Sequence, residues 1–201
     1  MPETHTVSGL DKDGYGVATT ADGATIRVDG ALPGDVVSGL VLDGVLDSPA
    51  FVERTDNHRV PPCADFVECG GCQAQHMNER LYREWKRGLP TDALAVQNID
   101  CPIGEMVMSA PASRRRAAFS LRYSEKGVEL GFQQARSHRI IAFAECQVIA
   151  PVLNKARGAL KALARAALPM MAVDAKPATS LVTVTKSGLD VALTQVARLN
   201  S

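Results

Sequence analysis

Three cysteines lie close together in the sequence. Cys63, Cys69 and Cys72 form a C-x5-C-x2-C pattern, with Gly70 and Gly71 between the last two. Cysteines with two residues between them can direct both thiolates to one centre, and glycines allow a tight turn that brings backbone N–H groups close to sulfur. The pattern therefore predicts a cysteine-bound metal centre.

A site with four thiolates needs one more ligand, and the remaining cysteines, Cys101 and Cys146, are the candidates. Cys101 precedes Pro102 in an apolar neighbourhood, and we expect it to be a small buried residue. Cys146 lies 74 residues beyond Cys72. Closing that loop costs about 4 kcal/mol, which metal ligation at roughly 10–16 kcal/mol can offset. Three close cysteines and a remote fourth favour an iron–sulfur cluster over zinc, since structural zinc usually takes two paired knuckles.

Length and composition limit the class of protein. The chain has 201 residues, 46% of them hydrophobic, which is enough for one large or two small folded domains. No apolar run approaches the roughly 18–20 residues that span a bilayer, and the first residues lack the pattern of a signal peptide. We therefore expect a cytoplasmic protein without membrane contact, in which thiols stay reduced. Of its five cysteines, an odd number, we expect one to be no metal ligand and the others to bind the metal.

The balanced overall charge hides a difference between the two parts of the chain. Residues 1–60 carry four basic and ten acidic side chains, a net charge of −6, and residues 61–201 carry 18 basic and 12 acidic ones, a net charge of +6. If the chain binds a polyanion, the second part is the better platform. Ordinary solvated surfaces are the alternative.

Residues 5–54 read as a small all-β unit. Five apolar-rich segments alternate with glycine-containing turns, a spacing that predicts an OB-like barrel. The expected strands are His5–Leu10, Gly16–Thr20, Ala24–Val28, Val36–Leu42 and Ala50–Val52.

The middle of the chain predicts a linker and two short helices. Residues 55–62 are polar and end in two prolines. A helical pattern runs over Asn78–Arg87, and we expect Gly88 and Pro90 to end it before a second helix at Thr91–Gln97. Trp85 is interpreted as a core anchor rather than a platform for base stacking.

The last part reads as strands around one helix. Arg116–Tyr123 and Val128–Phe132 form a predicted hairpin, and a helix is expected to begin at Pro151. Further strands are expected at Ile140–Phe143, Thr179–Thr185 and Leu189–Gln195.

Several of these segments together resemble one family, the RNA uridine-C5 methyltransferases, which use S-adenosylmethionine to make 5-methyluridine in ribosomal or transfer RNA. The resemblance covers nearly the whole chain in the family's order. Its motifs are 7–11, 14–18 and 28–35, similar to a TRAM domain; Cys63 with 69–76, similar to the cluster loop; and 114–116, 130–132, 136–141 and 145–154, similar to the central domain.

The resemblance implies an α+β protein with three parts. These are an OB-like β-barrel (TRAM) at 1–58, the iron–sulfur cluster loop and a helix at 59–90, and an incomplete mixed α/β central RNA-binding domain at 91–201. It assigns Cys146 as the fourth ligand of a [4Fe-4S] cluster. It also implies an RNA partner, no DNA, and a monomeric full-length protein.

The family's S-adenosylmethionine-binding catalytic domain is not expected within these residues. No cysteine and no glycine-rich strand–loop–helix follows Cys146. We therefore expect no catalytic and no S-adenosylmethionine-binding residue here, and no methyl transfer by this chain alone.

Six basic side chains are candidates for RNA contact because guanidinium groups pair with phosphates and stack on bases. They are Arg114, Arg115, Arg116, Arg136, His138 and Arg139. The alternative is that these arginines pair with Glu125, Glu129 and Glu145. At the level of function, two other hypotheses remain open: an electron carrier that uses the same cluster, and a zinc-stabilised RNA-binding module.

Overall fold

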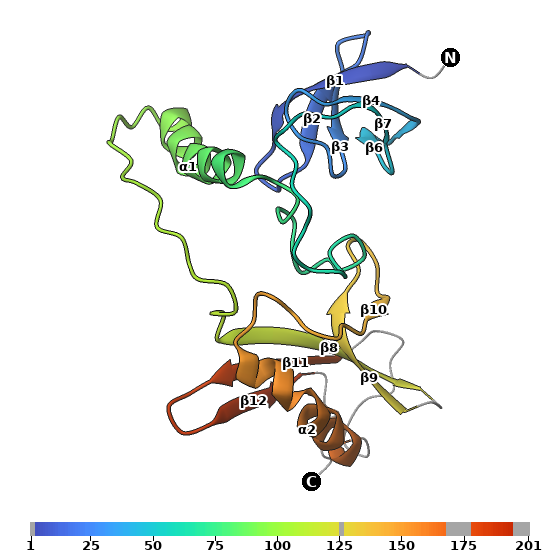
Figure 1. Cartoon of the computed structure of the whole chain (residues 1–201), viewed down its shortest axis with the longest axis vertical. Coiled ribbons are helices and arrows are strands. Elements are labelled where there is room, and N and C mark those ends of the chain that lie inside the picture. Colours follow the sequence, from blue (N-terminus) through green and yellow to red (C-terminus); the bar gives the residue numbers. More distant parts are fainter. Residues whose placement is uncertain (1–2, 125–126, 168–177, 195–201) are drawn as a thin grey trace. The chain divides into compact units, whose positions relative to one another are not determined.

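The computed structural model describes residues 3–124, 127–167 and 178–194, and these residues form mostly β-structure with two helices (Figure 1). The chain divides into two compact units. The first contains Met1–Pro61 and Gln73–Val107, and the second contains Pro62–Cys72 and Met108–Ser201. The domain boundaries expected from the sequence stay a prediction.

The first unit contains a curled seven-stranded sheet, which is consistent with an OB-like barrel. Its strand order is β5-β6-β3-β2-β1-β4-β7, and all neighbours are antiparallel except β3 and β6. The strands are β1 (Thr4–Leu10), β2 (Gly16–Thr19), β3 (Thr25–Val28), β4 (Val36–Ser38), β5 (Val41–Leu42), β6 (Val45–Leu46) and β7 (Ala50–Glu53).

The strand predicted over Val36–Leu42 is wrong in its second half. β4 ends at Ser38, and β5 and β6 form a hairpin around Asp43 and Gly44. Both turn residues have positive φ, 50° and 75°, as two-residue hairpin turns require. The alternation of β-branched residues indicated the strand but not the sharp break inside it.

The prediction of two short helices is also wrong, because α1 (Glu79–Val96) runs through Gly88 and Pro90 without ending. The Asn78 side chain accepts a hydrogen bond from the N–H of Leu81 and caps the helix. Leu81 and Trp85 are buried and Leu89 packs on the same cluster, and all three precede the proline. The apolar stripe thus anchors the first part of α1, and the helix continues through Pro90 although the proline removes a backbone hydrogen bond.

Trp85 is a core residue, as expected. Its side chain is 9% exposed, packs with Leu32 and Met77, and donates a hydrogen bond from Nε1 to the Asp11 carbonyl at 2.9 Å. A satisfied indole N–H is what a buried tryptophan requires.

A buried carboxylate fixes the segment that follows the barrel strands. Asp35 is fully buried and accepts hydrogen bonds from the N–H groups of Leu32 (2.8 Å) and Thr55 (2.9 Å), and it pairs with Nε2 of His58 at 2.7 Å. Burial alone would raise the pKa of Asp35, but these hydrogen bonds outweigh it and hold the pKa below its ordinary value. His76 lies beside His58, and burial lowers its pKa to about 4.

The second unit is a five-stranded sheet with one helix, and its strand order is β10-β9-β8-β11-β12. All neighbours in this sheet are antiparallel. The strands are β8 (Arg116–Ser124), β9 (Gly127–Gln133), β10 (Ile140–Ile141), β11 (Ala178–Val184) and β12 (Leu189–Leu193). β10 is shorter than the predicted strand at Ile140–Phe143, and the other predicted strands are confirmed within two residues.

Helix α2 (Pro151–Ala167) begins at Pro151 as predicted and lies across one face of this sheet (Figure 1). Leu153, Leu160 and Ala164 are buried against Phe119 and Leu130 of the sheet. Val152 and Leu163, two other apolar residues of α2, are 43% and 45% exposed. In the part of the chain that the structure describes, neither helix combines the length and apolarity needed to cross a bilayer.

Candidate metal centre

The cysteine loop docks on the end of β9 through its backbone. Cys69 forms an antiparallel bridge with Gln134, and the N–H of Gly70 donates to the Gln133 carbonyl at 2.9 Å. A Cβ at Gly70 would lie 2.7 Å from the Ala135 nitrogen and 2.8 Å from the Gln133 oxygen. Gly70 is therefore required for this close approach.

Local hydrogen bonds fold the same loop into consecutive turns. The N–H of Phe66 donates to the Cys63 carbonyl at 3.2 Å, and the N–H of Cys69 donates to the Asp65 carbonyl at 2.8 Å. The N–H of Gly71 points at Sγ of Cys69 at 3.4 Å. Such N–H···S contacts stabilise thiolate ligands in iron–sulfur sites.

The thiols of the four predicted ligands influence one another electrostatically. Burial is the main cause that raises the pKa of Cys69, and charge on Cys72, Cys146 and Cys63 raises it further. The pKa of Cys63 is also raised, first by burial and in part by Cys146 and Cys72. Cys146 thus contributes to the electrostatic surroundings of Cys63 and Cys69, although 74 residues separate it from Cys72 in the sequence.

This donor set fits a cationic cluster by its chemistry. All four side chains are half-buried, and a bound cation would favour the thiolate forms, which burial disfavours at Cys63 and Cys69. Among the described residues, no three His, Cys, Asp or Glu side chains have the arrangement of an assembled metal site. Ligation of a metal by these four cysteines therefore stays a prediction.

Cys146 lies in the loop between β10 and α2, where its backbone is fixed from α2. Its N–H donates to Oδ1 of Asn154 at 3.0 Å, and Nδ2 of Asn154 donates back to the Cys146 carbonyl at 2.9 Å. The side chain of Cys146 packs against the core of the second unit.

Cys101 does not behave as predicted. It was expected to be a small buried residue, but it is exposed, with Sγ near the Pro102 carbonyl at 3.7 Å. The apolar residues around it gave a misleading signal because Ile99 is itself 50% exposed.

The six predicted RNA-binding side chains all lie in the second unit and are all exposed. Arg115 donates to the Val184 carbonyl at 3.1 Å, and Arg116 donates to the Thr183 hydroxyl at 3.3 Å. Arg139 pairs with Glu68 of the cysteine loop at 3.0 Å, rather than with one of the expected glutamates. Glu125, one of those expected partners, lies outside the described residues.

The two segments that carry these basic residues are each held by backbone contacts or an ion pair within the second unit. Arg114 leads into β8 and its backbone pairs with residues 148 and 150. The loop that carries Arg136, His138 and Arg139 follows β9, at the point where the cysteine loop docks. A basic loop therefore lies beside the cysteine loop.

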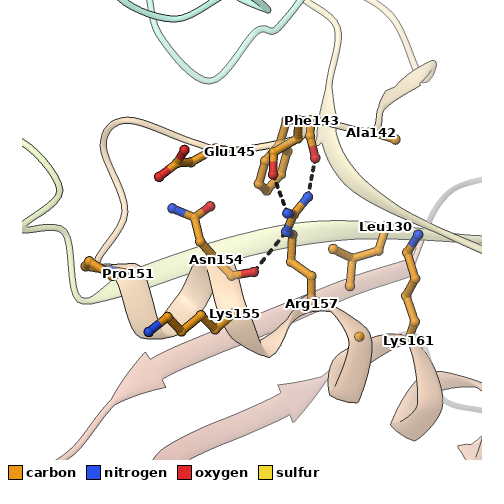
Figure 2. Close-up of a pocket in the computed structure, with 11 residues that line it drawn as sticks. Leu130, Ala142, Phe143, Glu145, Pro151, Asn154, Lys155, Arg157 and Lys161 are labelled. Atoms are coloured by element: carbon orange, nitrogen blue, oxygen red, sulfur yellow. Dashed lines mark hydrogen bonds between the residues drawn. The ribbon is translucent and has the colours of Figure 1, made fainter.

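A pocket of about 590 Å³ opens between α2 and the loop that precedes it (Figure 2). Leu130 and Phe143 contribute apolar surface, and Glu145, Lys155 and Lys161 contribute charge. Arg157 crosses this region and donates hydrogen bonds to the carbonyls of residues 143 and 144. The pocket therefore borders the segment that carries Cys146.

Sequence reasoning missed Asn154 and Arg157, which hold that segment. The contacts of Arg157 were missed because spacing along a helix does not show which carbonyl groups a guanidinium reaches. A polar asparagine in the first turns of a helix, shortly after a cysteine, is the signal that could have indicated the Asn154 contact.

Comparison with known proteins gives the chain's relatives. It is 37% identical over 199 residues to an uncharacterized RNA methyltransferase of Mesorhizobium japonicum (99% of this chain, 47% of that protein). It is 36% identical over 195 residues to an uncharacterized RNA methyltransferase of Brucella suis (97% and 46%). A 23S rRNA (uracil(1939)-C(5))-methyltransferase of Halomonas elongata is 34% identical over 157 residues (74% and 32%).

The chain therefore spans about half the length of the uncharacterized methyltransferases and about a third of the 23S rRNA enzyme. No protein-family model matches the chain. The relatives confirm the resemblance to RNA uridine-C5 methyltransferases that the motifs indicated.

Proposed function

Since this chain is related, across part of their length, to RNA methyltransferases that include uracil-C5 methyltransferases of 23S rRNA, we propose that it is the RNA-recognition and cluster-bearing N-terminal portion of such an enzyme. The whole enzyme would transfer a methyl group from S-adenosylmethionine to C5 of a uridine in ribosomal or transfer RNA. In this proposal the present residues bind and orient RNA, and the catalytic and S-adenosylmethionine-binding residues lie elsewhere.

The proposal is supported by two observations: Cys63, Cys69, Cys72 and Cys146 all belong to the second unit, and the pKa values of Cys63 and Cys69 are raised in part by the other cysteines. We propose that these thiolates hold a [4Fe-4S] cluster. The cluster would supply a rigid cross-link between the cysteine loop and the segment before α2. Because the backbone already docks the loop on β9, the cluster would stabilise an arrangement that the chain forms itself.

The cluster assignment is tested by metal analysis after anaerobic purification. We expect brown protein with about four iron and four sulfide per chain. Cys146→Ser removes the remote ligand and should lose most of this iron, whereas Cys101→Ser, a matched control, should keep it. One zinc in colourless protein would overturn the assignment and favour the zinc-stabilised module. Reversible reduction without RNA affinity would favour the electron carrier.

The exposed basic side chains of the second unit support RNA as the partner. We propose that Arg114, Arg115 and Arg116 at the start of β8, with Arg136, His138 and Arg139 after β9, contact the phosphates and bases of a single-stranded loop. The arginines whose hydrogen bonds are known use only part of their donor capacity. Arg116, for example, donates only Nε to Thr183, and each guanidinium has five N–H groups.

RNA binding is tested by its salt dependence. For single strands the slope of log K against log salt changes by about 0.7 for each phosphate contact. Removing two contacts with Arg114→Ala and Arg116→Ala should make this negative slope shallower by about 1.4. The matched control is Arg80→Ala with Arg83→Ala, which also removes two charges, but from arginines that pair with glutamates on α1. An equal loss of slope in both double variants would contradict the assigned surface.

A further inference from the structure

The segment that carries Cys146 has no strand or helix of its own, and Asn154 supplies the hydrogen bonds that regular structure would have given it. The Asn154 side-chain amide accepts from the Cys146 N–H and donates to the Cys146 carbonyl, at 3.0 and 2.9 Å. This pairing imitates a strand partner. It satisfies both backbone groups of the residue and restricts the rotations about φ and ψ, which fixes the direction of the Cα–Cβ bond that carries the thiol.

Arg157 fixes the two residues that lie just upstream. It lies three positions after Asn154 on α2, so both side chains project from the same face of the helix. Its guanidinium donates to the carbonyls of Phe143 and Ala144 and lies over the Phe143 ring, 4.9 Å from the centroid. Figure 2 shows Asn154 and Arg157 extending from α2 towards this loop. We call these two residues the α2 clamp.

The α2 clamp rests on a rigid support. Leu153, which precedes Asn154, is fully buried, and Leu160 and Ala164 anchor the next turns of α2 in the same core. Phe143, the ring beneath Arg157, is 4% exposed and stacks on Phe132 at the end of β9. The position of Cys146 is thus tied to the sheet on which the cysteine loop docks.

We propose that Asn154, supported by Arg157, is the positioning residue for the Cys146 thiolate and controls retention of the iron that this thiolate binds. The inference rests on the proposed function, because it requires the four-cysteine cluster. A remote ligand needs its thiolate held to a fraction of an ångström, and loss of an outer hydrogen-bonding partner typically weakens metal sites 10–100-fold.

The test measures iron release from anaerobically purified protein to a ferrous-iron chelator, together with thermal unfolding by circular dichroism. In Asn154→Ala we expect one of the four irons to leave at least about 10-fold faster than in wild type. Lys155→Ala, at the neighbouring exposed position, should release iron at the wild-type rate.

A second control separates positioning from general stability. Leu121→Ala removes a buried side chain from β8, in the same core but outside α2 and the α2 clamp. It should lower the melting temperature at least as much as Asn154→Ala and still release iron slowly. If both variants release iron equally fast, Asn154 acts through stability alone and the proposal is wrong.

The outcomes distinguish this inference from the function on which it rests. Iron release at the wild-type rate in Asn154→Ala, with iron lost in Cys146→Ser, overturns the positioning role and leaves the cluster assignment standing. Wild-type protein without a cluster overturns both. If Asn154→Ala does not fold, Asn154→Asp keeps the acceptor for the Cys146 N–H and removes the donor, and a folded variant with unchanged release also overturns the proposal.

Discussion

Gly70 shows how one absent side chain determines the geometry of the cysteine loop. Its backbone meets the end of β9 so closely that any Cβ would contact the Ala135 nitrogen and the Gln133 oxygen at less than 3 Å. These contacts are backbone atoms, which cannot move aside as a flexible side chain could. The neighbouring hydrogen bond from Gly70 to Gln133 depends on the same approach.

At this scale we predict that Gly70→Ala weakens the docking of the loop. The added methyl group must push the loop from β9, so we expect roughly 1–3 kcal/mol lower stability and a loss of bound iron, measured by urea unfolding and iron analysis.

Gly158→Ala is the control for this variant, because a Cβ there meets nothing within 4 Å. Alanine in a helix is favoured over glycine by about 1 kcal/mol, so this variant should be at least as stable as wild type. Equal behaviour of the two alanine variants would contradict the close-approach argument.

At the scale of elements, α1 contains a proline in its interior and still runs for 18 residues. Pro90 is exposed, and Leu81, Trp85 and Leu89, which bind the helix to the core, all precede it. The hydroxyl of Thr91 donates to the Arg87 carbonyl at 3.0 Å in the same turn. A side-chain hydrogen bond thus spans the turn in which the proline removes a backbone one.

We predict that Pro90→Ala stabilises the first unit by about 1–3 kcal/mol. The alanine restores a backbone N–H to the helix and relieves the clash of the proline ring with the preceding turn. Urea unfolding monitored by the fluorescence of Trp85, the only tryptophan, measures the change. Gly88→Ala should give a smaller gain of about 0.5–1 kcal/mol, since its Cβ meets nothing within 4 Å. A less stable Pro90→Ala variant would show that the ring itself contributes essential packing.

At the scale of the whole molecule, the two compact units differ in their buried titratable groups. The first unit contains Asp35, with its lowered pKa, and His76, whose pKa of about 4 results from burial and from the charges of His58 and Arg54, against the opposing charge of Asp35. His76 stays neutral in the folded chain down to about pH 4, whereas in the unfolded chain it binds a proton below its ordinary pKa of 6.5. The unfolded state therefore gains stability as the pH falls from 6.5 to 4.

We expect the free energy of unfolding of the first unit to fall by up to about 3 kcal/mol across that pH window. Stability contributed by Asp35 is present above its ordinary pKa of 3.8 and is lost as the pH falls further, so it acts in the same direction. Trp85 fluorescence in urea at a series of pH values measures the effect. In His76→Phe the proton uptake on unfolding near pH 5 should fall by about one. An unchanged pH dependence in this variant would show that His76 is not the responsible group.

The sequence by itself determined the features that depend on local pattern. The spacing of Cys63, Cys69 and Cys72, the turn glycines of the barrel strands and the proline at the start of α2 identified a cysteine loop, a β-rich first part and the position of α2. Ordered motifs also indicated the methyltransferase relatives that the comparisons then showed. Such signals are readable because turn chemistry, ligand spacing and helix starts are properties of a few neighbouring residues.

Only the tertiary structure decided which distant groups meet. The sequence analysis did not predict that the Asn154 amide pairs with the backbone of Cys146, that Gly70 approaches β9, or that α1 continues through Pro90. The first two are contacts between separate elements, and the spacing of residues along one element does not show which groups of another element it meets. Sequence patterns therefore revealed the candidate ligands, and the fold revealed what holds them in place.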